Sequence, residues 1–323
     1  MNLVVDGSKD DQREESDSEF KSRFKTEVTE RDLEKWWSEE KFKATAALWD
    51  LSPEEIENMK ELRSSLSDIF HWKNKPSEVV RFMRARPEDL KAQIQMFKNM
   101  IQWRKDNNVE SILSDYKPHK LLWRYYPGAM LKGRDKEGDP IYIERLGVTD
   151  APGLLNQLGE DEMIKHAIWT RELISKGKWI QKYEKTQERP VRRITIIEDL
   201  DGLSRRMLWG GTLSAYKKIM RLDQDNYCET AKKLIIIRAP WVFRMIWGIV
   251  SYFFDPGVVA KMTFCGHDDY LDVLEKHMDL RVLPKELYEN GEGVAEDECP
   301  PHFDGGVIPE EDLTVEHENR DNE

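Results

Sequence analysis

Three carboxylates lie close together in the segment ITIIEDLDG, which covers residues 194–202. Glu198, Asp199 and Asp201 follow a run of β-branched residues, so we expect them where a strand ends. The carboxyl ends of parallel strands are where α/β proteins place their sites, and hard metal ions prefer oxygen ligands. Acids at such positions more often cap loops and neighbouring helices. We favour that second interpretation over a metal site.

Other patterns of catalytic residues are absent from the sequence. It lacks the phosphate-binding pattern G-x-x-x-x-G-K-[ST], the nucleophile motif G-x-S-x-G and the zinc motif H-E-x-x-H. Gly291 and Gly293 are not followed by the third glycine of a dinucleotide-binding loop. We therefore expect a protein that is not an enzyme, with no catalytic residues, no metal and no cofactor.

Charge and cysteine content narrow the class of protein further. The 323 residues include 62 acidic and 50 basic side chains, for a formal net charge of −12, which argues against a nucleic-acid binder. Cys228, Cys265 and Cys299 lie far apart, match no zinc or redox spacing and fit the reducing cytosol. The first residues resemble no secretory signal, and we find no lipidation motif. We expect a cytoplasmic protein without a permanent membrane anchor.

The most hydrophobic segment, APWVFRMIWGIVSYFFDP, covers residues 239–256. A helix over 241–254 would be about 21 Å long, whereas the hydrocarbon core of a bilayer is about 30 Å thick. Arg244 would also be costly in lipid. Small and polar residues form only one narrow stripe of this helix, so apolar surface faces two directions. The helix is either buried on nearly every side, or it faces an internal cavity and a membrane surface.

The first third of the chain is predicted to be helical. Residues 1–30 are polar and aperiodic, and we expect them to be disordered. Apolar residues recur at helical spacing over 31–51, 53–70, 77–86 and 88–105. Ser52, Pro53 and Glu55 carry the pattern of a capping box with proline in the first turn.

Beyond Pro118, short β-branched runs alternate with longer helix-like stretches. The runs cover 141–146, 194–200, 233–239 and 261–265, and the helix-like stretches cover 160–185, 212–226 and 240–254. This alternation predicts an α/β unit whose strands are mainly parallel. The continuous apolar run at 234–237 predicts a strand that is buried on both faces.

Five segments carry a family resemblance, because they occur in one order along the chain. They are VVRFMRARPEDLKAQIQMFKNMIQWRKDN (79–107), WRYYPGAMLKGRDKEGDPIYIERLG (123–147), ITIIEDLDGLS (194–204), AKKLIIIRAPWVFRMIWGIVSYFFDPGVVAKM (231–262) and FDGG (303–306). Together they make residues 52–306 resemble the CRAL-TRIO lipid-binding family, in particular its fungal-type phosphatidylinositol/phosphatidylcholine transfer branch. The resemblance implies a helical subdomain, followed by a lipid domain whose hydrophobic cavity is closed by a gate helix.

The resemblance also implies positions for the lipid headgroup. Arg86, Glu229 and Lys261 match the residues that surround the inositol phosphate in phosphatidylinositol-binding members. Val258 stands where those members have a threonine, which removes a hydroxyl donor. Arg86 also ends a predicted helix, where a positive charge is favourable without any ligand.

The gate and pocket residues follow from the same resemblance. The expected pocket is lined by Ile194, Ile196, Val258, Ile246 and Phe253. The expected gate helix presents Trp241, Phe243, Met245, Trp247, Ile249, Val250 and Phe254. Ile194, Ile196 and Arg171 replace the serine, threonine and tyrosine of the choline-binding branch, which argues against phosphatidylcholine in its usual pose.

These observations lead to one main hypothesis. We expect an α/β protein with a disordered acidic tail (1–30), a helical subdomain (31–110), a lipid-binding domain with a mixed, mainly parallel sheet (115–306) and an acidic C-terminal tail (307–323). It would act as a monomer that carries one phosphatidylinositol-type phospholipid and exchanges it at membrane surfaces. The alternatives are a more apolar ligand (sterol-, tocopherol- or retinoid-like) and a lipid-sensing regulatory scaffold.

Overall fold

The computed structural model divides the chain into two compact units between Lys98 and Asn99. It describes residues 38–66, 76–87, 89–187, 191–208, 210–294, 303, 305–309 and 312. The tail expected over 1–30 and most of the tail expected over 307–323 lie outside the described residues. Each unit is described by itself below.

The first unit is helical, as expected. It contains α3 (Glu39–Trp49), α4 (Pro53–Ser65), α5 (Pro76–Ala85) and the beginning of α6 (Leu90–Asp106). The predicted capping box starts α4: the Glu55 amide donates to the Ser52 hydroxyl at 3.1 Å, and the Ser52 amide donates to the Glu55 carboxylate at 2.9 Å. Arg84 donates to Glu55 at 2.8 Å and to the Trp49 carbonyl at 3.0 Å, so it ties α3, α4 and α5 together.

The second unit is built on a five-stranded sheet in the order β1-β2-β3-β4-β5. β1 (Gly128–Arg134) and β2 (Pro140–Glu144) form an antiparallel hairpin. β3 (Ile194–Asp199), β4 (Ala231–Ile237) and β5 (Met262–Phe264) continue from β2 in parallel. The expected α/β class with a mixed, mainly parallel sheet is therefore confirmed.

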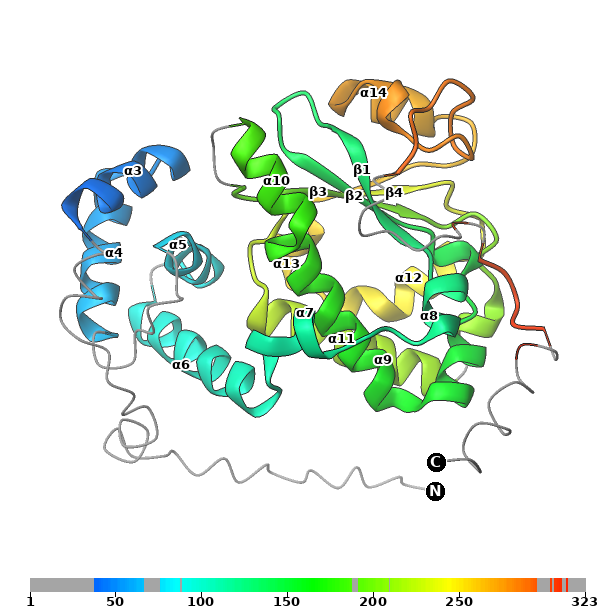
Figure 1. The fold of residues 1–323 in the computed structure, drawn as a ribbon, viewed down its shortest axis with the longest axis horizontal. Helices are drawn as coiled ribbons and strands as arrows, with labels where there is room; N and C mark the ends of the chain where they lie inside the picture. The colour runs from blue at the N-terminus through cyan, green and yellow to red at the C-terminus, as the bar shows by residue number, and fades with distance from the viewer. Residues whose placement is uncertain are drawn as a thin grey trace. The chain divides into compact units, whose positions relative to one another are not determined.

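Helices cover both faces of this sheet (Figure 1). Short helices α7 (Ile112–Asp115) and α8 (Lys120–Tyr125) precede it, and α9 (Ala151–Lys176), α10 (Lys178–Gln187) and α11 (Gly210–Asn226) connect its strands. α14 (Tyr270–His277) lies over one face, where Ile197, Ile235 and Leu274 share a buried cluster. α9 and α11 lie on the opposite side with α12 (Phe243–Val250) and α13 (Pro256–Val259).

Three elements differ from the sequence-based prediction. The strand pattern did not reveal β1, because its sequence GAMLKGR has two glycines and only three consecutive apolar residues. The helix expected over 160–185 is two helices, separated at Gly177. The gate helix expected over 241–254 is only Phe243–Val250, and a 3₁₀ turn at Ser251–Phe253 continues it. None of the helices in the described part of the chain is long and apolar enough to cross a bilayer.

The loops that follow β2 and β3 meet through their backbones. A Cβ atom on Gly147 would lie 2.0 Å from the carbonyl oxygen of Asp201. Gly202 adopts a φ of 89°, in the left-handed region that glycine favours, and faces the carbonyl of Gly147. A side chain at position 147 would therefore push apart the strand ends that carry Glu144 and Glu198.

We expect Gly147→Ala to lower the free energy of unfolding by about 1–3 kcal/mol, because backbone atoms cannot move aside as a flexible side chain can. Gly248→Ala in α12 is the matched control, since a Cβ there would meet nothing within 4 Å. Urea denaturation of both variants measures the difference. Equal stabilities of the two variants would contradict this account of the loop contact.

Candidate functional site

The three acids at the end of β3 divide between the two faces of the sheet. Asp199 accepts hydrogen bonds from Arg145 at 3.2 Å and from Arg238 at 2.9 Å, and Arg238 also pairs with Asp201 at 3.0 Å. Glu198 points to the other face, because neighbouring residues of a strand alternate. The described residues contain no cluster of three potential metal-ligating side chains. Asp199 and Asp201 therefore form ion pairs on one face of the sheet, whereas Glu198 lies apart from them on the other face.

Glu198 lies beside a second glutamate on the face of the sheet toward α9. Glu144 is its register partner on β2 and is 5% exposed. Arg171 of α9 lies 3.7 Å from the Glu144 carboxylate, and it forms two hydrogen bonds of 2.8 Å each with Asp223 of α11. We call these four residues the Glu198 cluster. In it, three carboxyl groups face one guanidinium group.

The surroundings raise the pKa of both glutamates. Burial raises the pKa of Glu198 to about 8, and the nearby Glu144 carboxylate adds to this shift while Arg171 opposes it. Burial also raises the pKa of Glu144, again against the opposing charge of Arg171. Near neutral pH, Glu198 therefore carries a proton and can donate a hydrogen bond.

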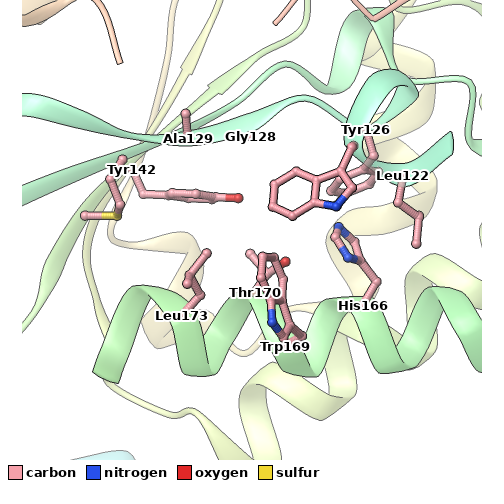
Figure 2. Close-up of a pocket in the computed structure, with 11 residues that line it drawn as sticks. Leu122, Tyr126, Gly128, Ala129, Tyr142, His166, Trp169, Thr170 and Leu173 are labelled. Carbon is pink, nitrogen blue, oxygen red and sulfur yellow. The ribbon is translucent and has the colours of Figure 1, made fainter. Parts of the chain in front are cut away.

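A small cavity adjoins the Glu198 cluster between α8, β1, β2 and α9. It is lined by Leu122, Trp123, Tyr126, Gly128, Ala129, Met130, Tyr142, His166, Trp169, Thr170 and Leu173 (Figure 2). Its volume is about 20 Å³, which admits roughly one or two water molecules. The cavity in this form therefore accepts a small polar group but not an acyl chain.

Polar atoms face this cavity from several sides. Figure 2 shows the Tyr142 hydroxyl pointing into it, with His166 on the α9 side. Burial lowers the pKa of His166 to about 3, so the ring is neutral, and its Nδ1 has no hydrogen-bond partner among the described residues. A Cβ on Gly128 would lie 2.4 Å from the Tyr142 hydroxyl and 3.4 Å from Cγ of Glu144. Gly128 thus brings the cavity next to Glu144.

The five expected pocket residues do not line this cavity. Ile194 is buried against Met130 and Ile174, and Ile196 is half-buried beside it. Ile246 is buried on the inner side of α12, whereas Phe253, in the 3₁₀ turn after that helix, and Val258, in α13, are half-buried. Their assignment to a lipid pocket stays a prediction.

Two of the three expected headgroup residues meet directly. Lys261 donates to the Glu229 carboxylate at 2.5 Å, and Arg193 donates to the same carboxylate at 2.6 Å. Sequence reasoning missed Arg193, because it precedes β3 without any motif of its own. We call Arg193, Glu229 and Lys261 the Glu229 cluster. Arg86 belongs to the first unit, where it follows α5 and donates to the Ala85 carbonyl at 2.8 Å.

The expected gate residues separate by exposure around α12. Val250 is buried, together with Val242 and Ile246. Trp241, Met245 and Ile249 are 72%, 45% and 41% exposed, and Tyr252 beyond them is 87% exposed. The remaining gate residues, Phe243, Trp247 and Phe254, are half-buried and contact one another in an aromatic group that includes Phe264.

Cationic side chains lie next to this apolar surface. The Arg205 guanidinium lies over the Trp241 ring at 5.4 Å, and the Lys217 ammonium lies over the Phe253 ring at 5.3 Å. Arg244 is exposed on α12 itself. In a chain of strongly negative net charge, this surface therefore combines exposed aromatic groups with local positive charge.

Comparison with known proteins identifies the family. A family model described as the CRAL/TRIO domain matches residues 126–288, which contain the sheet, the Glu198 cluster and α12. The chain belongs to the CRAL/TRIO domain family. This confirms the family resemblance seen in the sequence, although the match does not single out a branch.

Relatives and a solved structure agree with this assignment. The chain is 34% identical over 246 residues to Protein real-time of Aedes aegypti and 32% identical over 245 residues to Protein real-time of Drosophila melanogaster. Each alignment covers 74% of this chain but only 38% and 36% of the relatives' own lengths. The crystal structure of Sfh5 has the same fold, with a TM-score of 0.57 at 12% identity, over 78% of this chain and 94% of that one.

The raised pKa of Glu198 makes a prediction about stability. The unfolded chain releases this proton near pH 4.3, whereas the folded chain keeps it to about pH 8. Protonated Glu198 therefore contributes its full share to the free energy of unfolding below the pKa of the unfolded chain. This contribution is lost as the pH rises through the pKa of Glu198 in the folded chain. Relative to Glu198→Gln, the wild-type protein should lose stability between about pH 5 and pH 8, by at most about 1.4 kcal/mol per pH unit.

Denaturation of lipid-free protein at several pH values measures this difference. The exposed Glu275→Gln variant is the control, and its curve should run parallel to that of the wild type. Parallel curves for wild type and Glu198→Gln would show that Glu198 titrates normally.

Proposed function

We propose that this chain is a lipid-binding module that holds one lipid behind α12 and exchanges it at membrane surfaces. The observation that carries the proposal is that α12 has two apolar faces, one buried and one exposed to solvent. Val242, Ile246 and Val250 face the protein, whereas Trp241 and Ile249 face solvent, on α12 and the two residues that precede it. Large apolar groups exposed together mark a surface that meets another apolar phase. The family and the fold support the same function.

The chemistry of this surface suits a membrane interface. Aromatic side chains favour the boundary between headgroups and acyl chains, and basic side chains beside them attract anionic lipids. α12 is about 12 Å long, so it can lie in the interface but cannot cross it. We propose that movement of α12 away from the domain opens the way for the lipid, because the cavity next to β1 accepts only water-sized molecules.

The exposed face of α12 gives the test of this function. We expect Trp241→Ala combined with Ile249→Ala to lower the rate of lipid transfer between vesicles at least about tenfold, since each side chain contributes about 1.5–3 kcal/mol when buried in lipid. Leu113→Ala, which alters an exposed apolar residue elsewhere on the domain, should leave the rate unchanged.

A fluorescence assay with labelled donor vesicles measures both rates. Equal rates for the double variant and the wild type would remove α12 from the mechanism. Absence of any co-purifying lipid and of any transfer by the wild-type chain would defeat the proposed function as a whole.

For the lipid itself, we propose a phosphatidylinositol-type phospholipid whose phosphate lies at the Glu229 cluster. Two cationic side chains, Arg193 and Lys261, meet at the Glu229 carboxylate, and both are groups that bind phosphate through charge-assisted hydrogen bonds. We also propose, as part of the same hypothesis, that the chain is similar to the fungal-type transfer branch of the family. Val258 offers no hydroxyl, and the apolar Ile194 and Ile196 favour the alternative of a more apolar ligand.

Lys261→Ala separates these possibilities. We expect it to weaken binding of an inositol phospholipid about tenfold, because a charge-assisted hydrogen bond is lost, and to leave a neutral lipid unaffected. Lys276→Ala on the exposed side of α14 is the control. Lipid-binding measurements with both ligands decide the matter, and equal losses for the two lipids would assign Lys261 a structural role.

A further inference from the structure

The last described residues of the chain pack against α8. We call them, residues 303, 305–309 and 312, the C-terminal strap (red in Figure 1). The strap forms no strand of the sheet. Its contacts include α8 itself and the loop that joins β2 to α9. It therefore lies beside one wall of the cavity between α8, β1, β2 and α9.

Backbone groups hold the strap against the loop after β2. The Gly306 amide donates to the Val148 carbonyl at 2.8 Å, and the Ile308 amide donates to the Asp150 carboxylate at 3.0 Å. Gly305 adopts a φ of 69°, in the left-handed region that glycine favours. A Cβ atom on Gly305 would lie 2.7 Å from the Val148 carbonyl oxygen. These contacts give the strap a defined path over the domain.

Two side chains of the strap hold α8. Ile308 is buried and shares an apolar cluster with Leu122 and Tyr125 of that helix. The Tyr125 hydroxyl donates to the Asp312 carboxylate, and Arg124 pairs with the same carboxylate at 3.3 Å. The strap thus contacts α8 through an apolar anchor at Ile308 and a polar anchor at Asp312.

α8 lies between the strap and the cavity. Leu122, Trp123 and Tyr126 line the cavity, and Leu122 belongs also to the cluster around Ile308. A helix of six residues is too short to be stable alone, so its position depends on what packs against it. The cavity of about 20 Å³ must enlarge before an acyl chain can enter. Displacement of α8 would enlarge it.

The strap can leave α8 without disruption of the sheet. The side chains of Arg124 and Asp312 are 54% and 26% exposed, and an ion pair that solvent reaches contributes little to stability. Val307, next to the apolar anchor, is 64% exposed. Segments attached in this way open locally at a lower cost in free energy than a core strand does.

We propose that the C-terminal strap restrains α8 and thereby slows the exchange of lipid. This inference rests on the proposed lipid-binding function and adds a means of regulating it. With the strap in place, α8 keeps the cavity small. When the strap leaves, α8 can move away from β1 and α9, and the cavity can accept an acyl chain. A segment outside the cavity thus controls the rate at which lipid enters.

The double variant Ile308→Ala with Asp312→Ala removes both anchors in the full chain. We expect amide hydrogen exchange in α8 to become at least about tenfold faster, because the helix loses its packing on one side. The transfer of pyrene-labelled phosphatidylinositol between phosphatidylcholine vesicles should become at least about threefold faster. Unchanged hydrogen exchange in α8 would overturn the proposal, and so would faster exchange there without faster transfer.

Two controls separate a restraint on α8 from a general loss of stability. Val307→Ala changes an exposed residue of the same strap and should alter neither rate. Leu274→Ala removes a buried side chain of α14 on the opposite face of the sheet. It should lower the stability of the domain but keep lipid transfer within about twofold of the wild-type rate. An equally large gain in transfer by Leu274→Ala would overturn the role of the strap.

Further outcomes distinguish this inference from the proposed function. If the double variant does not fold, Asp312→Ala alone is measured, and unchanged hydrogen exchange in α8 would again overturn the proposal. A wild-type chain that transfers lipid at the rate of the double variant would overturn the restraint and leave the proposed function intact. A wild-type chain that binds and transfers no lipid would overturn both, even where the strap variant loosens α8.

Discussion

Because both faces of the central sheet are covered, a charged side chain on β2 or β3 must find its partner inside the protein. Asp199 does so through Arg145 and Arg238 on the face toward α14. Glu198, the preceding residue, faces α9 and shares the single Arg171 with Glu144 and Asp223. One strand thus carries a satisfied ion pair on one face and an incompletely satisfied cluster on the other.

The apolar side chains of α12 also divide into a buried set and an exposed set. Two stripes run along this helix, each with a spacing of four residues, and they are displaced from one another by one residue. One stripe is buried, so α12 packs on the domain in this structure. The other stripe leaves Trp241 and Met245 in water, which gives the helix an apolar surface for contact with lipid. A helix with two such faces can exchange one apolar environment for another at little cost.

Much of the fold could be predicted from the sequence, since apolar runs such as Leu234–Ile237 record burial directly. β1 was not predicted, because its glycines interrupt the apolar pattern of a strand. Gly128 is needed there for a close contact, since it makes room for the Tyr142 hydroxyl. Glu198 was noticed, but grouped with Asp199 and Asp201 by spacing alone, and strand alternation places it on the other face. The partnership of Arg171 and Asp223 spans 52 residues and has no local signal. Charge pairs between residues far apart in the sequence could therefore be identified only in the structure.

Two charged clusters of different composition lie at opposite ends of the parallel strands. The Glu229 cluster lies near the start of β4 and is partly exposed, with side-chain exposures of 17% to 25%, so a phosphate there would remain hydrated. The Glu198 cluster lies at the other ends of the parallel strands, where burial raises the cost of any added negative charge. The two ends of the parallel strands thus differ in electrostatic character: one holds cationic groups that solvent reaches, and the other holds buried carboxyl groups. Negative charge costs less free energy at the first end than at the second, because burial at the second end removes the solvent that would stabilise it.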